Sequence, residues 1–597
     1  MWTDASAEEI AGIIEECFGA APLPQLHDEQ AIRRARETAE RQGVLERIEQ
    51  ELAADESIGV LPYSTFRQYR HIGNRRNFEA LQQWRGEQIE LAAMAVLFDV
   101  PPRAGSKRSA LEFLHDLLWA ECEASWWVMP AHERHGTPID LRVALCACKY
   151  ATILTLLRER IEPEVRQRML DEIDRRVLRP YLSAEHRHRW KTVTNNWNAV
   201  CLGNVGIAAM LVETEAPRLG RLIADALSHL PSFLSGFAPD GGCTEGPSYW
   251  RFGFGWFIRL AAALHDYTGG RIDLAAGERV GRIARYPLSV ALAPGKELTF
   301  ADAHSGYQDP VTAMLINRFH DAGELFGLCE LRPDGQLACR TLEALLLYGG
   351  RTCTPLADAA DHLLPALGVA LVRAGGTSLG AKAGHNGEHH NHNDVGSFLV
   401  FRDGCYYLTD PGAPIYSART FSDRRYESIF CNSLGHSVPV IGGRPQPPGA
   451  QFAGTIAAEG LDARSGRTLT IELAGAYDVA SLTRLTRVIE LADDGEEVRL
   501  ADTFAFAEAP PPVEEAFITT HPAAVAPDGR SVAIQPDGAA PATLSAVDSD
   551  GHFAVAELAE ESRAESRSGE TIRRITFTPP APAAERTLRF VLRFATA

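Results

Sequence analysis

The chain has 597 residues, which is too long for a single hydrophobic core, so we expect two or three domains. Its composition, 45% hydrophobic and 23% charged, is that of a globular protein, and no apolar run reaches the roughly 18–20 residues that span a bilayer. The formal net charge of −19 argues against nucleic acid as a partner, and the sequence predicts neither a nucleic-acid nor a membrane partner.

The start of the chain and the cysteines bear on the cellular compartment. Residues 1–9 have neither a basic nor an apolar segment, so no secretory signal is expected. The eleven cysteines are odd in number and lack zinc-finger spacing. Both observations predict a reducing compartment, the cytoplasm. A periplasmic location stays open if a leader segment has been removed.

The first part of the chain, up to about residue 350, has apolar residues at helical spacing with polar faces between them. Many consecutive antiparallel pairs predict an (α/α) toroid of helical hairpins over residues 1–355. The expected helices are 8–18, 32–52, 78–98, 141–160, 162–177, 203–212, 216–234, 252–267, 309–328 and 336–347.

From about residue 367 the pattern changes to period two, with Gly, Asp and Pro in the gaps. This predicts an antiparallel β-sandwich over residues 356–597, so the fold class is multidomain α+β. The chain after about residue 505 is rich in Ala, Pro and Glu, and we expect it to form the periphery of the sandwich without chemistry. The expected strands are 368–373, 396–401, 468–473, 485–491, 497–502 and 588–594.

The most unusual stretch is 384–394, where four of the 19 histidines fall within eight positions. Such a polar cluster is costly to bury unless its members bind something or one another. If the strand after it begins early, alternation places His390, His392 and Asp394 on one face, and the returning strand brings Asp410 near the same level. This predicts a metal site or an acid–base site. The alternative is a solvated loop that happens to be rich in histidine.

One further histidine extends this cluster. His436 follows in the segment 432–439 and could be a third metal ligand beside His392 and Asp410. Two imidazoles and a carboxylate match the ligands that zinc prefers, which predicts a divalent metal, zinc, with a structural role.

Two earlier segments carry polar groups next to a predicted helix. Asn195 and Asn196 lie in the segment 194–201, where their amides could cap a helix or donate hydrogen bonds to a substrate carboxylate. Tyr249, Trp250 and Arg251 follow a glycine-containing loop at 240–248, and a phenol, an indole and a guanidinium grouped there fit a site better than a core.

Aromatic and basic residues of the helical part indicate a carbohydrate partner. All nine tryptophans lie between Trp2 and Trp256, and several stand beside polar or glycine-containing segments. An indole face suits the apolar face of a sugar ring, although core packing is the alternative for each ring. The basic run 186–191 offers a local site for an anionic substrate. The expected substrate-binding residues here are Trp127, Arg189, Trp190, Trp197 and Trp250.

A predicted helical toroid is followed by a predicted sandwich that carries HNHNDVGSF, DPG, RYE and GHSVP at 390–398, 410–412, 425–427 and 435–439. This combination resembles the heparinase II/III family of polysaccharide lyases and its alginate-lyase relatives. The resemblance covers most of the chain, and the histidine block is its most specific part. The segments NNW at 195–197 and EGPSY at 245–249 match the family's motifs in order and approximate spacing.

The resemblance implies β-elimination at a 4-linked uronate in an acidic polysaccharide or oligosaccharide. Asn196, with Asn195 as the alternative, would hydrogen-bond the uronate carboxylate and stabilise the enolate-like intermediate. Tyr249 would protonate the leaving oxygen and could also act as the base, with Arg251 as a nearby cation. His390 would be a base or a carboxylate neutraliser.

The same resemblance implies that His392, Asp410 and His436 hold a structural zinc ion, and that Glu245, Arg425 and Tyr426 line the substrate. Trp197 stands where many relatives have histidine, which leaves the uronate epimer open.

Two other functions stay open from the residues alone. A glycoside hydrolase on the same scaffold needs two carboxylates facing one glycosidic bond, for which Asp240 and Glu245 are the pair available. A non-catalytic glycan-binding protein is the second alternative.

Overall fold

The computed structural model describes residues 2, 5–52, 57–101, 107–133, 136–348, 353, 360–461 and 463–595. The chain forms two compact units. The helical unit comprises Met1–Gly236, Arg251–Gly281 and Gln308–Pro355, and the sandwich unit comprises Phe237–Trp250, Arg282–Tyr307 and Leu356–Ala597. The predicted boundary between residues 355 and 356 lies outside the described residues. The two early segments of the sandwich unit were not indicated by the sequence pattern.

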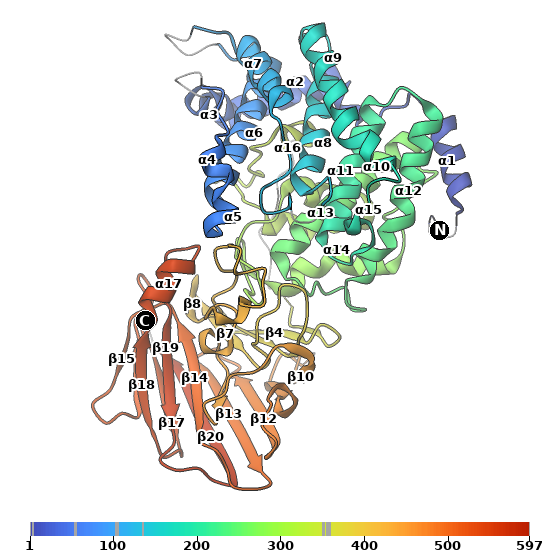
Figure 1. The fold of residues 1–597 in the computed structure, drawn as a ribbon. Helices are drawn as coiled ribbons and strands as arrows, with labels where there is room; N and C mark the ends of the chain where they lie inside the picture. The colour runs from blue at the N-terminus through green and yellow to red at the C-terminus, as the bar shows by residue number, and fades with distance from the viewer. Residues whose placement is uncertain are drawn as a thin grey trace. The chain divides into compact units, whose positions relative to one another are not determined.

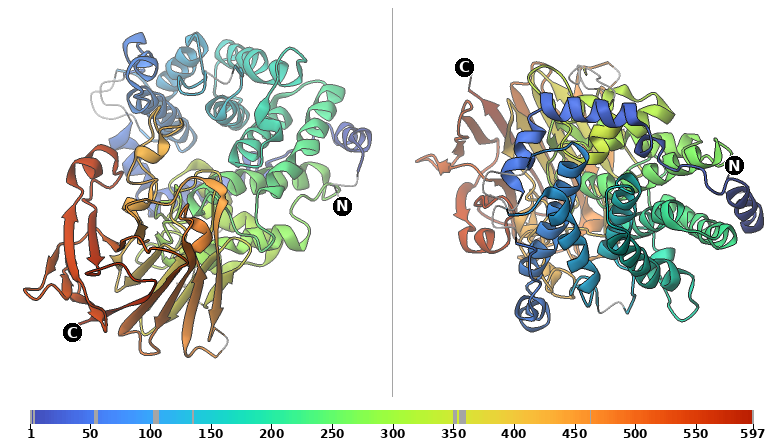
Figure 2. Two further views of the ribbon diagram at one scale, coloured as in Figure 1. Left: turned by 60° about the horizontal axis from the view of Figure 1, so that its bottom comes forward. Right: turned by 90° about the horizontal axis from the view of Figure 1, so that it is seen from above.

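The helical unit consists of helices that lie side by side, with short connections between them (Figures 1 and 2). Helix α11 packs against α8 and α12, α6 against α7, and α16 against α2. The helices are α1 (Ala7–Glu16), α2 (Glu29–Arg41), α3 (Val44–Glu51), α4 (Tyr63–Phe66), α5 (Gln68–Ile72), α6 (Arg76–Leu97), α7 (Ala110–Glu123), α8 (Leu141–Leu156), α9 (Pro163–Ile173), α10 (Arg179–Leu182), α11 (Asn196–Val212), α12 (Ala216–Ser235), α15 (Pro310–His320) and α16 (Leu342–Leu347). Helices α13 (Pro247–Thr268) and α14 (Glu278–Val290) each contain residues of both units.

Two helices differ from their predicted ranges for clear local reasons. The predicted helix 32–52 is broken at Gly43, whose φ of 71° ends α2 and begins α3. The predicted helix 203–212 begins earlier, at Asn196, because Asn195 caps it. Helix α11 is apolar on nearly every face and is buried along almost its whole length, as expected for a helix in the interior of a helical layer.

The sandwich unit contains three larger antiparallel sheets. In order, the nine-stranded sheet is β15 (Ala523–Val525), β16 (Ser531–Ile534), β17 (Ala542–Val547), β20 (Glu585–Phe594), β13 (Glu497–Phe506), β12 (Leu482–Leu491), β11 (Arg467–Glu472), β10 (Gly449–Glu459) and β6 (Gly384–Asn386). The four-stranded sheet is β18 (His552–Glu557), β19 (Arg573–Thr578), β14 (Val513–Thr519) and β9 (Val440–Ile441). The five-stranded sheet is β3 (His362–Leu364), β4 (Val369–Ala374), β5 (Thr377–Lys382), β7 (Phe398–Arg402) and β8 (Cys405–Leu408).

Two further short strands, β1 (Ala291–Ala293) and β2 (Lys296–Glu297), form a hairpin before the loop that contains Asp302. Strands β7 and β8 form a hairpin in which Arg402 lies opposite Cys405. The sheets enclose one hydrophobic core, to which β12 contributes Leu485 and Ile489 by alternation.

Two predictions about this unit are wrong. Residues 387–397 form a loop rather than the start of a strand, so strand alternation does not place His390, His392 and Asp394 on one face. The chain after 505 is not peripheral, because β20 lies between β17 and β13 in the large sheet and carries the buried Phe590.

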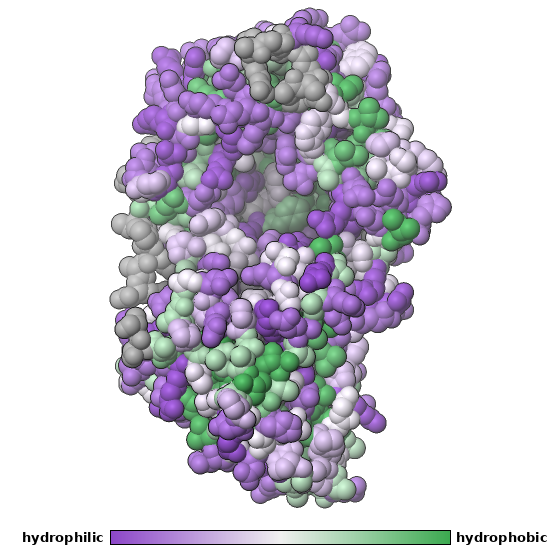
Figure 3. Space-filling model, turned by 90° about the vertical axis from the view of Figure 1, so that its left-hand side faces the viewer, coloured by the Kyte–Doolittle hydropathy of each residue, from purple (hydrophilic) through white to green (hydrophobic). Residues whose placement is uncertain are grey.

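The face of the molecule in Figure 3 is largely polar, as expected for a chain with the composition of a globular protein. Figure 3 shows one face of the molecule, on which hydrophilic side chains predominate and a hollow exposes hydrophobic side chains at its depth. No helix in the part of the chain that the structure describes is long and apolar enough to cross a membrane.

A buried arginine joins the sheets at the core. Arg487 on β12 is fully buried and bonds Asp502 at 2.6 Å and Glu515 at 3.1 Å. Its other amino group donates to the carbonyls of Gly396 at 2.7 Å and Ser437 at 2.6 Å. Gly396 and Ser437 flank segments that carry the predicted metal ligands, so Arg487 fixes the backbone around them.

Replacing this arginine tests the contribution of the buried network. The substitution Arg487→Met leaves Asp502 without its cation in the core, and we expect the free energy of unfolding to fall by about 3–5 kcal/mol. Urea unfolding measures the change. The control is Arg499→Met on β13, whose side chain is 52% exposed and pairs with Glu497. This control should change stability by about 1 kcal/mol or less. Equal losses in both variants would contradict the account.

Candidate functional site

The sandwich unit contains a buried carboxylate, Asp302, that gathers four donors. Its Oδ2 atom lies 2.7 Å from His390 Nδ1 and accepts from Tyr416 Oη at 3.0 Å. Its Oδ1 atom lies 3.0 Å from His392 Nε2 and accepts from Arg425 at 2.8 Å. Burial opposes the charge, but the bonds from the two histidines and the charge of Arg425 outweigh it and hold the pKa of Asp302 well below its usual value. The carboxylate is therefore ionised.

Two glycines explain how distant segments meet at the loop 300–303. Gly246 has a φ of 86°, and a Cβ there would lie 3.0 Å from Ala303 Cβ and 3.2 Å from the Phe300 carbonyl. Gly412 has a φ of 64°, and a Cβ there would collide with the Ala303 carbonyl. The Ala413 amide donates to this carbonyl at 2.9 Å. Only glycine lets these segments approach so closely, and Tyr249 and Tyr416 follow them in sequence.

The charge state of Asp302 fixes the two histidine tautomers. An ionised carboxylate can only accept hydrogen bonds, so His390 carries a proton on Nδ1 and His392 carries one on Nε2. In a neutral ring the other nitrogen then has a free electron pair. For His390 this is Nε2, on a side chain that is 18% exposed. For His392 it is Nδ1, which is buried and has no hydrogen-bond partner.

Tyr249 lies directly beside this pair. Its ring stacks on His390 with 4.3 Å between ring centroids, and its hydroxyl lies 2.5 Å from the hydroxyl of Tyr416. Burial and the charge of Asp302 raise the pKa of Tyr249 above its usual value. Tyr249 therefore holds its proton at neutral pH. The cation next to the two phenols is Arg567, whose guanidinium lies 4.6 Å from the Tyr416 ring centroid.

Backbone strain coincides with this group. His390 has a φ of 57° and Ala301, next to Asp302, has a φ of 59°. Non-glycine residues rarely adopt positive φ, and such residues concentrate at functional sites. The histidine and the loop that carries its partner are thus both held in unfavourable backbone conformations by the surrounding structure.

The helical unit places the two asparagines differently. The Asn195 carboxamide accepts from the Trp197 amide at 3.2 Å, so it caps α11. The capping alternative therefore holds for Asn195, and Asn196 is the better candidate for binding a carboxylate. Asn196 is the first residue of α11 and packs against Gly253, where a Cβ would lie 3.1 Å from its own Cβ. Arg251 belongs to the same unit, and its role stays a prediction.

The prediction that tryptophans stack on a sugar is wrong for three of them, because each ring is buried and its N–H donates to a backbone carbonyl. Trp127 donates to Glu121 at 2.9 Å, Trp190 to Ile139 at 2.8 Å, and Trp250 to Ile283 at 2.7 Å. These indoles are core residues.

The other predicted substrate-binding residues differ in how far their side chains are free to contact a substrate. Trp197 is half-buried and packs edge-on against His132, while Arg189 is exposed. Arg425 is committed to Asp302, and the Tyr426 hydroxyl donates to the Asn391 side chain at 2.8 Å. Arg425 and Tyr426 thus hold the loop around His390 in place. The sequence predicted substrate binding for them and did not predict this supporting role. Glu245 is buried near His390, with 4.0 Å between Glu245 Oε1 and His390 Nε2.

The helical unit also contains a cavity of about 710 Å³. Charged residues in its wall pair with one another, as Arg259 does with Asp309 at 2.6 Å and Lys149 with Glu90 at 3.2 Å. Much of the remaining wall is apolar. We therefore place the candidate site at Asp302 in the sandwich unit.

Comparison with known proteins identifies the sandwich unit. Residues 357–590 match the family described as Heparinase II/III-like, C-terminal. This part of the chain is similar to that family. Comparison with curated proteins found no match.

Solved structures share the architecture of this chain. A structure of heparinase III has a TM-score of 0.61 at 12% identity, over 96% of this chain and 93% of that one. The heparan sulfate lyase HepC from Pedobacter heparinus has a TM-score of 0.57 at 14% identity, over 99% and 88%. Chondroitin AC lyase from Streptomyces coelicolor A3, solved with chondroitin sulphate, has a TM-score of 0.51 at 12% identity, over 99% and 83%. At these identities the likeness shows the fold, and the predicted toroid followed by a sandwich is confirmed.

The predicted metal ligands of the sandwich unit converge. His392, Asp410 and His436 offer donor atoms that all lie within 4.8 Å of one another, and all three residues are buried. The donor set suits zinc, and the unpartnered Nδ1 atom of His392 is the kind of buried polar atom that a metal would satisfy. Burial lowers the pKa of His392, which keeps the ring neutral as a metal ligand must be. The residues present therefore fit a zinc ion.

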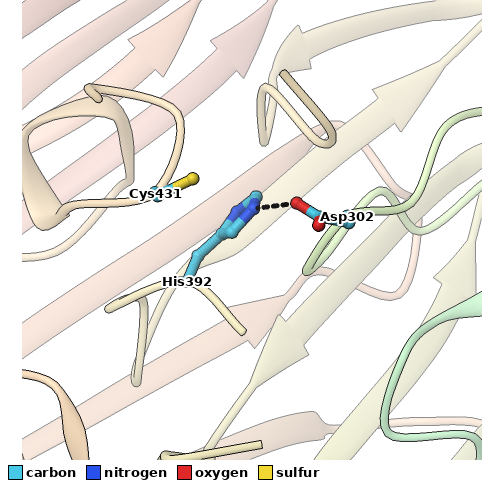
Figure 4. Close-up of side chains that lie close together, drawn as sticks. All are labelled: Asp302, His392 and Cys431. Carbon is cyan, nitrogen blue, oxygen red and sulfur yellow. Dashed lines mark hydrogen bonds and ion pairs between the residues drawn. The ribbon is translucent and has the colours of Figure 1, made fainter. Parts of the chain in front are cut away.

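A second donor set shares His392. Asp302, His392 and Cys431 also lie within 4.8 Å of one another, with Asp302 and Cys431 on opposite sides of the imidazole in Figure 4. This set suits a cation less well, because Asp302 already bonds the guanidinium of Arg425 and burial raises the pKa of the Cys431 thiol to about 12.

Sequence reasoning missed three residues of this site. From the sequence, the loop with Asp302 could line a cleft, with capping or a surface turn equally possible, and Asp302 was not among the predicted site residues. Tyr416 and Arg567 were given no role. Asp302 lies in a loop more than 80 positions before the histidines, and no spacing rule connects such segments. One feature of the sequence could have indicated a buried Asp302. The residues on either side of it, Ala301 and Ala303, are small and permit close packing.

Metal analysis tests the ligand set. Protein produced with added zinc is expected to retain about one zinc ion per chain after dialysis, and His436→Ala should lose it because two ligands do not hold the ion. Mass spectrometry of the metal content measures both. His304→Ala is the control, since this histidine bonds Ser248 at 3.1 Å and lies outside the donor set. Zinc retained in His436→Ala would contradict the assignment.

Proposed function

We propose that this protein is a polysaccharide lyase that cleaves a uronate-containing acidic polysaccharide or oligosaccharide by β-elimination and leaves a 4,5-unsaturated uronate. The observation that carries the proposal is a proton acceptor and a proton donor, His390 and Tyr249, whose rings stack with 4.3 Å between centroids. His390 bonds Asp302 directly, and Tyr249 is linked to it through the hydroxyl of Tyr416. The match of residues 357–590 to the heparinase II/III-like family and the fold shared with three lyases support the same reaction class.

His390 is suited to remove the C5 proton. Asp302 holds its Nδ1 proton, so the electron pair on Nε2 is available to the substrate. A neutral imidazole is the usual base near neutral pH, and the carboxylate behind it stabilises the imidazolium that forms.

Tyr249 is suited to protonate the leaving oxygen O4. Its raised pKa keeps the phenol protonated, as a general acid must be before reaction. The C5–H bond breaks, its electrons form the double bond between C4 and C5, the C4–O4 electron pair leaves on O4, and O4 takes the proton of Tyr249. One proton is removed and one is delivered, so no oxidant or reductant takes part.

The remaining roles follow the family resemblance. Asn196 in the helical unit would donate to the uronate carboxylate, whose charge otherwise makes the C5 proton too weakly acidic to remove. A zinc ion held by His392, Asp410 and His436 would supply a fixed positive centre that keeps His392 in place behind Asp302.

The hydrolase alternative is less well supported. It requires Asp240 as one of two free carboxylates. The carboxylate of Asp240 instead accepts from the backbone amides of Gly242 at 3.1 Å, Ala366 at 2.8 Å and Leu367 at 3.1 Å. These bonds give Asp240 a structural role.

A panel of substrates tests the proposal: heparan sulfate, heparin, hyaluronan, chondroitin and dermatan sulfates, alginate and glucuronan. Ultraviolet absorbance of the unsaturated uronate should rise with at least one of them. New reducing ends without this absorbance would replace the proposal with the hydrolase. Neither signal with any substrate would overturn it in favour of a glycan-binding protein.

Removing the proposed acid separates an enzyme from a binding protein. Tyr249→Phe keeps the ring that stacks on His390 but has no proton to deliver, so kcat should fall by about 10²–10⁴-fold. Substrate affinity, measured by calorimetry, should stay within a few-fold. Tyr407→Phe is the control, because this hydroxyl bonds the Ala540 carbonyl at 2.6 Å in the sheet. Unchanged turnover in Tyr249→Phe would contradict the assignment.

Asp302→Asn tests whether the carboxylate sets the tautomer of His390. An amide can donate as well as accept, so it no longer requires a proton on Nδ1, and kcat should fall by about 10²-fold or more. Zinc content should stay near that of the wild type, since Asp302 is not one of the three ligands. Asp403→Asn, in the exposed turn between β7 and β8, is the control. A variant that keeps full activity would contradict the role.

A further inference from the structure

Tyr416 occupies a position that the reaction described so far does not use. Its hydroxyl donates to Asp302 Oδ2 at 3.0 Å and lies 2.5 Å from the Tyr249 hydroxyl. It reaches this place from the loop after Gly412, and Arg567 from the segment between α17 (Ala559–Glu565) and β19 covers its ring at 4.6 Å. Tyr416 is thus the link between the buried carboxylate and the proposed acid.

The direction of each hydrogen bond follows from the chemistry of the groups. The hydroxyl of Tyr416 donates its single proton to Asp302 Oδ2 in the resting site. The Tyr249 hydroxyl must then donate to Tyr416. When Tyr249 turns its proton toward the leaving oxygen of a substrate, its own electron pairs face Tyr416.

We propose that Tyr416 is a positioning residue for the acid step: it switches its O–H from Asp302 to the oxygen of Tyr249 as Tyr249 gives up its proton. This inference rests on the proposed function. The O–H bond of Tyr416 does not break. The bond that breaks is the O–H of Tyr249, whose proton goes to O4 while the electron pair stays on the phenolate. The hydrogen bond from Tyr416 stabilises this phenolate, and solvent restores the proton after product leaves.

Asp302 can release Tyr416 without being left unpaired. Three donors, His390, His392 and Arg425, still bond its two oxygens at 2.7–3.0 Å. An isolated carboxylate in a buried position would hold its only donor tightly, because a buried ion without partners is costly. The several donors on Asp302 therefore make the switch of Tyr416 possible.

The charges around the two phenols agree with this role. Asp302 and Glu245 face Tyr249 with negative charge, which opposes a phenolate. The hydrogen bond from Tyr416 and the charge of Arg567 favour it. Burial and the same carboxylate raise the pKa of Tyr416 well above its usual value, so Tyr416 remains a donor throughout. His390, stacked on Tyr249, completes the set of neighbouring titratable groups.

The test compares two leaving groups in Tyr416→Phe. On the natural polymer, kcat should fall by about 10²-fold, the size of effect seen when one donor to a developing oxyanion is removed. On a uronate that carries a nitrophenyl group on O4, the leaving group needs no proton, and the same variant should retain nearly wild-type kcat. Tyr406→Phe is the control, because this hydroxyl bonds Ser305 at 2.7 Å away from Tyr249 and should leave both rates unchanged.

The outcomes separate the inference from the function it rests on. A wild-type protein that forms no unsaturated product from either substrate would overturn the proposed lyase itself. A wild-type lyase whose Tyr416→Phe variant loses the same factor on both substrates would show a structural role for Tyr416 and overturn the inference alone. Full activity of the variant on the polymer would also overturn it.

Discussion

A buried carboxylate that can only accept hydrogen bonds determines how the groups around it are protonated. Asp302 bonds two imidazoles, one phenol and one guanidinium, and these come from separate parts of the sequence. Because each partner must donate, Asp302 leaves one nitrogen of His390 and one of His392 with a free electron pair. In the proposed function, one free pair would take a substrate proton and the other would bind a metal ion. Two neighbouring histidines with the same side-chain chemistry would thus have different roles.

The fold is arranged to keep this carboxylate buried and ionised at once. Gly246 and Gly412 let two segments pack against the loop 300–303. Arg425 supplies a positive charge that offsets the cost of burying the Asp302 carboxylate in its ionised form. Behind the site, Arg487 bonds Asp502 and fixes the carbonyls of Gly396 and Ser437. The sandwich therefore contributes rigid backbone positions, and the loops contribute the reactive groups, a division common in enzymes.

Much of the fold could be predicted from the sequence because it depends on local periodicity. Helical spacing indicated most of the longer helices of the first part, although α7 and α14 were not predicted. Alternation indicated β12 and β13 close to their observed bounds. The proposed metal ligands His392, Asp410 and His436 were predicted from residue type, and their donor atoms converge. Asp302, Tyr416 and Arg567 could not be predicted, since their contacts join segments up to 167 positions apart, as between Tyr249 and Tyr416, and depend on side-chain packing. The predicted sugar-binding role of three tryptophans was wrong for the same reason, because residue type does not distinguish a buried indole from an exposed one.

A neutron crystal structure of the protein tests the central claim most directly, because it locates the deuterium atoms around Asp302. The account predicts deuterium on Nδ1 of His390 and on Nε2 of His392, with the Tyr416 hydroxyl directed at Asp302 and no deuterium on the carboxylate itself. Deuterium on Asp302, or on Nε2 of His390 with none on its Nδ1, would contradict the account, because the carboxylate would then not set the protonation of the histidine beside it.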